Sequence, residues 1–290
     1  MPEAAGARTP GPILPRLTAL YRDSGIDIVT GLNPSHFDNF PMAPFTWFIK
    51  HGESLTNGLG IGLQEIYFLE CLFARFRPHR LFVIGNALGW SSLALGLLNP
   101  QGRVLAIDAG SDRNAAWGIE LTNALAHEHD LPVLAISGRS PDDVPAALHA
   151  HRIAPVELAF IDGYHSVEQV GLDFAAIRPD AAPDCLYLFH DVESFGLHPG
   201  IERIAAQAGL AWELLLGTTS GMALVYDPAH RPDALDDIAP FVVPADMVGL
   251  MRGFAWNHRH RHLARWRRSL RKRFGGSSAA PPSPKPALAP

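Results

Sequence analysis

Residues 80–108 read RLFVIGNALGWSSLALGLLNPQGRVLAID, and this stretch decides the fold. Leu81–Ile84 is a short apolar run that stops at a glycine, as expected for a strand buried on both faces. Residues 85–89 (GNALG) predict a tight turn. Residues 90–98 then have helical spacing, up to a stop signal in the sequence NPQG. The stretch therefore begins with a strand, a glycine turn and a helix.

A second apolar run, residues 103–107, predicts the next strand, and it ends at Asp108. In such a unit the turn glycines let a ligand approach the backbone, and an acid after the second strand can bind ribose hydroxyls. A dinucleotide-binding turn would read G-x-G-x-x-G, whereas Asn86-Ala87 leaves G-x-x-x-G here. The turn therefore favours a ligand without a diphosphate, of which S-adenosylmethionine is the common one. The alternative is an ordinary strand–helix–strand crossover without a ligand.

Length and composition fit a single α/β domain with extensions. The chain has 290 residues, of which 47% are hydrophobic, and a net charge of -5, which provides no general reason to expect nucleic acid as a partner. Cys71 and Cys185 lie in apolar contexts without motif spacing and are expected to be reduced core residues. No signal peptide and no run of about 18 apolar residues is present. We therefore expect a cytoplasmic protein.

The order of segments predicts five parts. Residues 1–15 are expected to be disordered, and residues 16–60, which are rich in aromatic and turn-forming residues, to form an N-terminal cap. This cap either covers the substrate or has only a structural role. Residues 61–230 form the predicted catalytic domain, residues 231–274 a C-terminal extension, and residues 275–290 a disordered tail rich in Ser, Ala and Pro.

Strand-like and helical segments alternate regularly through the predicted domain. Five β–α units are followed by two β-like runs, residues 212–216 and 222–226, which are joined by GTTSG and predict a closing hairpin. Within this series, Ser140 is predicted to cap a helix over residues 141–151. The pattern predicts an α/β fold with a doubly wound, mainly parallel, seven-stranded sheet and a terminal antiparallel hairpin.

Polar residues follow each of the five predicted parallel strands. In such sheets, ligands bind beyond the carboxyl ends of the strands. The residues concerned are Gly85 and Asn86, Asp108, Ser137, Asp162 with His165, and His190 with Asp191. Because the pattern recurs after five strands, we expect these residues to meet at one site.

Two further segments strengthen this interpretation: residues 160–174 (FIDGYHSVEQVGLDF) and 186–192 (LYLFHDV). Together with residues 80–108, they resemble class I S-adenosylmethionine-dependent methyltransferases. The similarity is to a small-molecule O-methyltransferase group in which D-G-x-H after the fourth strand is paired with H-D after the fifth. The resemblance covers roughly residues 60–227.

The resemblance implies a set of cofactor-binding residues. Glycine-turn residues would line the methionine part of S-adenosylmethionine, an acid would hold the ribose, and a later segment would flank the adenine. The turn residues are Gly85, Asn86 and Gly89, the acid is Asp108, and the later segment is Ser137, Gly138 and Arg139. Asp162 adjoins the same site. Many class I members also carry an acid where this sequence has Val83, so the amino group of the cofactor needs another acceptor here.

Catechol-type O-methyltransferases, which the same segments resemble, hold a divalent metal after the fourth and fifth strands. By position the ligands would be Asp162, His190 and Asp191, and His165 replaces the catalytic lysine. Mg²⁺ or Mn²⁺ would lower the pKa of the acceptor hydroxyl, although a histidine ligand weakens the case for Mg²⁺ and favours Mn²⁺, Fe²⁺ or Zn²⁺. In the metal-free alternative, His165 or His190 is the general base and an aspartate orients its ring.

The C-terminal segment is strongly basic. Residues 259–273 (RHRHLARWRRSLRKR) contain no acid and predict a basic amphipathic helix, with membrane-surface contact as one hypothesis and a solvated tail as the other. The expected partners are thus a small-molecule acceptor and no specific nucleic acid. Peripheral membrane contact and a homodimer are further hypotheses.

Three functions compete at this point. The leading prediction is S-adenosylmethionine-dependent methylation of a small molecule, on a hydroxyl oxygen of a sugar or another secondary metabolite. The second is an NAD(P)-dependent oxidoreductase, which the absence of G-x-G-x-x-G disfavours. The third is a catalytically silent protein that binds cofactor or associates with membranes.

Overall fold

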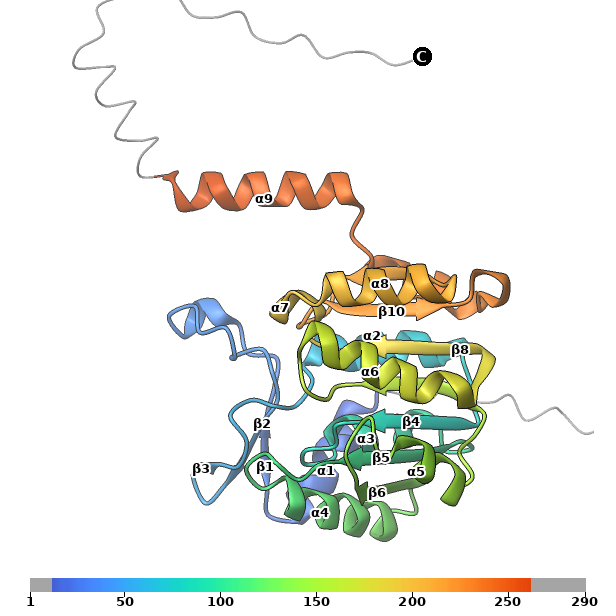
Figure 1. The fold of residues 1–290 in the computed structure, drawn as a ribbon. Coiled ribbons are helices and arrows are strands. Elements are labelled where there is room, and N and C mark those ends of the chain that lie inside the picture. The colour runs from blue at the N-terminus through green and yellow to red at the C-terminus, as the bar shows by residue number, and fades with distance from the viewer. Residues whose placement is uncertain (1–11, 262–290) are drawn as a thin grey trace, which may run out of the picture. The chain divides into compact units, whose positions relative to one another are not determined.

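A computed structural model describes residues 12–261 of the chain (Figure 1). The chain divides into two compact units, Met1–Val243 and Pro244–Pro290. In the second unit, the structure describes one helix, α9 (Ala245–Arg259). The features that follow belong to the first unit.

A seven-stranded sheet forms the centre of the first unit. Its strand order is β6-β5-β4-β7-β8-β10-β9, and β10 runs antiparallel to both of its neighbours, while β4 to β8 pair in parallel. The strands are β4 (Arg80–Ile84), β5 (Arg103–Asp108), β6 (Val133–Ser137), β7 (Val156–Ile161), β8 (Ala181–Phe189), β9 (Ala211–Leu215) and β10 (Met222–Tyr226). This arrangement confirms the predicted doubly wound sheet and its terminal hairpin.

Helices cover both faces of the sheet because alternate strand residues point to opposite sides. Leu81 and Val83 belong to one buried cluster, and Phe82 and Ile84 to another. The first cluster includes residues of α1 (Leu14–Asp23), α2 (Leu63–Arg75), α3 (Trp90–Leu98) and α4 (Ala115–Glu128). The second includes residues of α5 (Val144–Ala150), α6 (Val167–Ile177), α7 (Val192–Phe195) and α8 (His198–Ala208). Both faces of the sheet are therefore buried, as the continuous apolar runs predict.

The N-terminal segment is more regular than its sequence indicates. It contains α1 and a small antiparallel sheet of β1 (Asp27–Val29), β2 (Trp47–Lys50) and β3 (Glu53–Ser54), with a short 3₁₀ turn, η1 (Pro34–His36), between the first two strands. The buried Tyr21 packs against Phe48 and Trp90, at ring-centroid distances of 5.2 and 5.5 Å. Its hydroxyl donates a hydrogen bond to the Leu88 carbonyl at 2.8 Å. The segment is thereby fastened to the glycine turn of the main domain.

The predicted disorder of residues 1–15 is wrong for the part that the structure describes. Ile13 is fully buried, and its N–H donates to Glu70 Oε1 at 2.6 Å, while Leu14 begins α1. An apolar side chain that finds a place in the core overrides the local Pro- and Gly-rich composition. Residues 1–11 lie outside the described residues.

The first unit also extends beyond residue 230, where the sequence predicts an extension to begin. Three 3₁₀ turns follow β10, namely η3 (Pro228–His230), η4 (Asp233–Asp236) and η5 (Ala239–Phe241); a further one, η2 (Arg178–Asp180), lies between α6 and β8. Leu235, Ile238 and Phe241 from this segment are buried in the core.

The predicted basic helix over residues 259–273 falls almost entirely outside the described residues, as does the predicted disordered tail over residues 275–290. Between residues 12 and 261, we find no helix with the length and apolar character needed to cross a bilayer.

Candidate active site

A cavity of about 1150 Å³ lies at the carboxyl ends of the parallel strands. Residues that follow β4, β5, β6, β7 and β8 line one side of it. The N-terminal segment, which lies beyond this edge of the sheet in Figure 1, contributes Met42, Phe45 and residues 58–61. The predicted cap therefore forms part of the cavity wall.

The glycine turn has a shape that only glycine allows at its first position. Gly85 has φ +92°, and a Cβ built on it would lie 2.0 Å from the Asp162 carbonyl oxygen. The turn is further held by Asp108, whose Oδ2 accepts hydrogen bonds from the N–H groups of Asn86 and Ala87, both at 2.8 Å. Asp108 Oδ1 accepts from the Gly110 N–H at 2.7 Å. The acid after the second strand thus shapes the turn as well as facing the cavity.

Most of the predicted cofactor residues line this cavity, and two do not. Those that line it are Gly85, Asn86, Asp108, Gly138, Arg139 and Asp162. Gly89, with φ +85°, instead precedes α3 and faces Thr122, whose Oγ1 would lie 2.1 Å from an added Cβ. Ser137 is the last residue of β6 and is likewise absent from the cavity wall.

Asn86 contributes its backbone to the turn, while its side chain is buried. Its Nδ2 donates to Thr122 Oγ1 at 3.0 Å, and its Oδ1 accepts from Ser92 Oγ at 2.9 Å. The side chain therefore holds the turn in place through buried hydrogen bonds and does not reach into the cavity.

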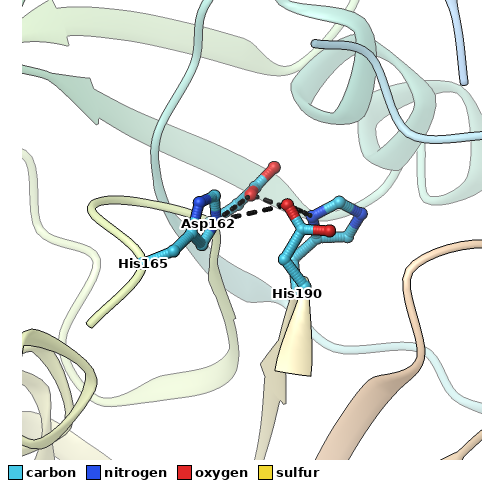
Figure 2. A group of neighbouring side chains, drawn as sticks. Asp162, His165 and His190 are labelled. Atoms are coloured by element: carbon cyan, nitrogen blue, oxygen red, sulfur yellow. Dashed lines mark hydrogen bonds and ion pairs between the residues drawn. The ribbon is translucent and has the colours of Figure 1, made fainter. Parts of the chain in front are cut away.

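The predicted catalytic residues gather around one carboxylate. Asp162 Oδ1 lies 3.2 Å from His165 Nε2 and 3.0 Å from His190 Nδ1. The dashed lines in Figure 2 join both imidazole rings to the Asp162 carboxylate. Asp191 Oδ2 is 3.6 Å from His165 Nε2 and 3.5 Å from His190 Nδ1. One ligand atom from each of these four residues lies within 4.8 Å of the others, which is a spacing that a single metal ion could bridge.

Glu65 is a member of this site that the sequence analysis missed. It lies on α2, is fully buried, and its Oε1 is 3.2 Å from His190 Nε2. The same oxygen accepts hydrogen bonds from the N–H of Ser220 at 2.9 Å and its hydroxyl at 2.5 Å. Oε2 accepts from the Gly62 N–H at 2.6 Å, which makes Glu65 the third residue of a helix capping box. That spacing was the available signal, but it indicates a helix start and not an active site.

The charges of the site stabilise one another. Burial alone would raise the pKa of the Asp162 carboxyl, but His190 and His165 outweigh it and hold that pKa well below its usual value. The pKa of Glu65 is lowered in the same way, against the effect of burial, by His190 and by the hydrogen bonds that it accepts. Burial would lower the pKa of His190, yet Asp162 and Glu65 raise it well above 6.5. The pKa of His165 is also raised, because Asp162 and Asp191 outweigh its desolvation.

Comparison with known proteins identifies the central part of the chain. Residues 82–192 match a family model described as a methyltransferase domain. A search of curated proteins finds no match.

Among solved structures, the chain is similar to the O-methyltransferase TomG from Streptomyces achromogenes, crystallised with S-adenosylmethionine (20% identity, TM-score 0.46, covering 59% of this chain and 82% of that one). It is also similar to an O-methyltransferase from Bacillus cereus in complex with S-adenosylhomocysteine (16%, TM-score 0.45, 57% and 79%). A third is a putative caffeoyl-CoA O-methyltransferase from Staphylococcus aureus (16%, TM-score 0.43, 52% and 76%).

The matched segment runs from β4 to the residue that follows His190 and Asp191, so it contains the glycine turn and both histidine motifs. The sheet that contains this segment has the doubly wound strand order, and its closing antiparallel strand, β10, lies beyond the matched residues. Nothing in the comparisons favours the oxidoreductase alternative. Residues 82–192, which hold the glycine turn and both histidine motifs, are therefore similar to a methyltransferase domain.

Proposed function

We propose that this protein is a class I S-adenosylmethionine-dependent methyltransferase that transfers the methyl group to a hydroxyl oxygen of a small-molecule acceptor. The observation that carries the proposal is the position of the Asp162–His165 pair, which faces the same cavity as the glycine turn and Asp108. A hydroxyl must lose its proton to attack a methyl sulfonium, and an imidazole oriented by a carboxylate is suited to remove it.

Within the cavity, the methionine part, the ribose and the adenine of the cofactor are proposed to lie beside the residues that follow β4, β5 and β6, in that order. Backbone groups of Gly85 and Asn86 would face its methionine part, Asp108 the ribose, and Gly138 and Arg139 the adenine. Val83 is buried in the core and cannot accept a hydrogen bond from the cofactor amino group. Residues 58–61 also line the cavity, and backbone carbonyls of this segment are the proposed acceptors.

The acceptor is proposed to enter between the N-terminal segment and α7. Met42, Phe45 and Leu59 of the N-terminal segment and Phe195 of α7 all line the cavity. The Phe195 ring stacks on His165 at a centroid distance of 4.6 Å. A cavity of about 1150 Å³ has room for the cofactor and one small molecule, and its apolar walls suit a compound of mixed polarity.

In the proposed reaction, His165 takes the proton of the acceptor hydroxyl while Asp162 holds the imidazole ring and stabilises its charge. The oxygen forms a bond to the methyl carbon as the carbon–sulfur bond breaks. S-adenosylhomocysteine and the methyl ether leave, and the proton remains on His165 until solvent removes it.

The same side chains fit a divalent cation, proposed at Asp162, His190 and Asp191. The Nδ1 atom of His190 faces the two aspartates, while its Nε2 faces Glu65. A carboxylate behind a histidine is a common arrangement around metal ligands, because it fixes the ring and its tautomer. A bound ion would lower the pKa of the acceptor hydroxyl, and a nitrogen ligand favours Mn²⁺ over Mg²⁺.

Asp108→Ala is expected to weaken binding of S-adenosylhomocysteine by tenfold or more. The substitution removes the proposed ribose acceptor and also three hydrogen bonds to backbone N–H groups of the turn. Calorimetric titration measures the effect, with Glu128→Ala on the exposed surface of α4 as the control. Unchanged affinity in Asp108→Ala would show that the ribose lies elsewhere.

The proposed function is tested by calorimetry followed by a transfer assay. The protein is titrated with S-adenosylhomocysteine, and with NADH as the control, in EDTA and in Mg²⁺ or Mn²⁺. We expect micromolar binding of S-adenosylhomocysteine alone. Methyl-labelled S-adenosylmethionine is then supplied with a panel of phenols, sugars and other hydroxyl compounds. Binding without transfer to any hydroxyl would favour the catalytically silent alternative.

A further inference from the structure

Helix α9, labelled in Figure 1, exposes a row of large apolar side chains. Within the described residues 12–261, this helix has no buried residue. Met247, Leu250, Met251 and Phe254 are between 46% and 57% exposed. Residues three, four and seven positions apart share one face of a helix, so these four side chains lie side by side. We call them the apolar stripe.

The remaining surface of α9 is more polar. Arg252 and Arg259 are seven positions apart and therefore share a face beside the stripe. The only other large apolar side chain, Trp256, is two residues beyond Phe254 and points to the opposite side of the helix. Its ring stacks on His260 at a centroid distance of 3.7 Å. The helix is therefore amphipathic, although no part of the described chain covers its apolar face.

The sequence around the stripe is strongly basic, in contrast to the rest of the chain. Residues 247–290 contain ten of the 24 Lys and Arg residues and none of the 29 Asp and Glu residues. Their net charge is therefore +10, whereas residues 1–246 have a net charge of -15. An apolar face among so many cations is complementary to a surface that is anionic outside and apolar beneath. A bilayer with anionic lipids has both properties.

We propose that α9 and the basic sequence after it attach this protein to the surface of a membrane that contains anionic lipids. The apolar stripe would enter the boundary between headgroups and acyl chains, and the Arg and Lys residues would interact with lipid phosphates. At 15 residues the helix is too short to cross a bilayer, so it would lie in the plane of the surface. The same surface would repel the acidic residues 1–246, which confines the contact to the C-terminal part of the chain.

The proposal does not depend on the proposed methyl transfer, because no residue of α9 lines the cavity. Two other partners would satisfy only part of this surface. Nucleic acid would match the positive charge but would leave the apolar stripe exposed. A second copy of the helix would cover the stripe, but it would bring two groups of ten positive charges together.

The first experiment is cosedimentation of the full-length protein with lipid vesicles. One set is made of phosphatidylcholine alone, and the other also contains phosphatidylglycerol. We expect the protein to partition at least about tenfold more strongly into the anionic vesicles, since each Lys or Arg near such a surface strengthens binding by about fivefold. Added NaCl should weaken this binding because it screens the charges.

The double variant Leu250→Gln and Phe254→Gln tests the apolar stripe. It preserves the charge and changes only exposed side chains, so the protein should fold as the wild type does. Partitioning into anionic vesicles should fall by about tenfold or more, because the burial of one such side chain strengthens binding by about that factor. Trp256→Gln is the matched control: the residue is 64% exposed but faces away from the stripe, so this variant should bind as the wild type does.

Other results would overturn the proposal. Equal partitioning of the wild type into neutral and anionic vesicles, or into neither, would do so without any variant. Unchanged binding by the double variant, or an equal loss in Trp256→Gln, would show that the stripe is not the contact with lipid. If the wild type bound duplex DNA in place of vesicles, the partner would be nucleic acid. If it did not bind vesicles and sedimented as a dimer that the double variant dissociates, the partner would be a second copy.

Discussion

His165→Ala is expected to lower the rate of methyl transfer by about 10²- to 10⁴-fold while leaving the affinity for S-adenosylhomocysteine nearly unchanged. The imidazole is the proposed acceptor of the substrate proton, and Asp162 holds it at 3.2 Å. Its loss removes the base but none of the proposed contacts to the cofactor. The measurement combines single-turnover transfer from labelled S-adenosylmethionine with calorimetric titration of S-adenosylhomocysteine.

The result also discriminates between the two histidines of the site. His127→Ala, on the exposed side of α4, is the matched control and should behave as the wild type. If His165→Ala retained most of its activity while His190→Ala lost it, the base would be His190, which the sequence leaves open. The geometry favours His165, because His190 is 3% exposed and both of its ring nitrogens face carboxylates.

Glu65→Ala is expected to reduce the free energy of unfolding by about 3–5 kcal/mol, the range for breaking a buried ion pair. The change removes the ion-pair partner of His190 Nε2 and the acceptor of the Ser220 N–H. It also removes the hydrogen bond from the Gly62 N–H at the start of α2. Urea unfolding in EDTA measures the effect without a contribution from bound metal.

Two further variants serve as references for the change in unfolding free energy of Glu65→Ala. Glu65→Gln keeps an acceptor for the Ser220 and Gly62 donors but removes the charge that faces His190, so its loss should be smaller. Glu128→Ala, on the exposed surface, should be close to neutral. A loss of less than 1 kcal/mol in Glu65→Ala would mean that the Glu65–His190 contact contributes little to stability.

The same cluster predicts how stability depends on pH. Glu65 and Asp162 have lowered pKa values, so their contribution is complete above about pH 4.5, the ordinary value for Glu, and is lost as the pH falls through the folded-state values. His190 has a raised pKa, so its contribution is complete below about pH 6.5 and is lost as the pH rises through its folded-state value. The free energy of unfolding should therefore decline below pH 4.5, and Glu65→Ala should decline less steeply there. Equal slopes in the two proteins would contradict the assignment of Glu65 to this cluster.

The sheet could be predicted from local sequence patterns, because the signals that mark each strand lie within a few residues of one another. The run at residues 81–84 has no polar position, since β4 is buried on both faces, and a turn with φ +92° at its end requires Gly85. The hairpin from Trp212 to Tyr226 carries its own turn sequence. The same reasoning predicted that Asp162, His165 and His190 lie close together, because residues that follow parallel strands meet at one edge of the sheet.

Sequence reasoning failed where the deciding partner is distant in the chain. Glu65 meets Ser220, which is 155 positions away, and the sequence near Glu65 describes only a helix start. Ser140 has a good local capping pattern, but its hydroxyl bonds to Asp173 instead. Leu235 and Phe241 lie in a segment without regular periodicity and are buried all the same.

By itself, the sequence determined the order of the strands and helices, the glycine turn, and the acids and histidines at the strand ends, since all of these depend on short-range periodicity and backbone preference. Only the tertiary structure decided which side chains reach the cavity and which support it from behind. The side chain of Asn86 points into the core, and the carboxylate of Glu65 contacts the ring of His190. The physical reason is that a buried polar group must find a partner wherever the packed chain supplies one, and that partner follows from the fold and not from neighbouring residues.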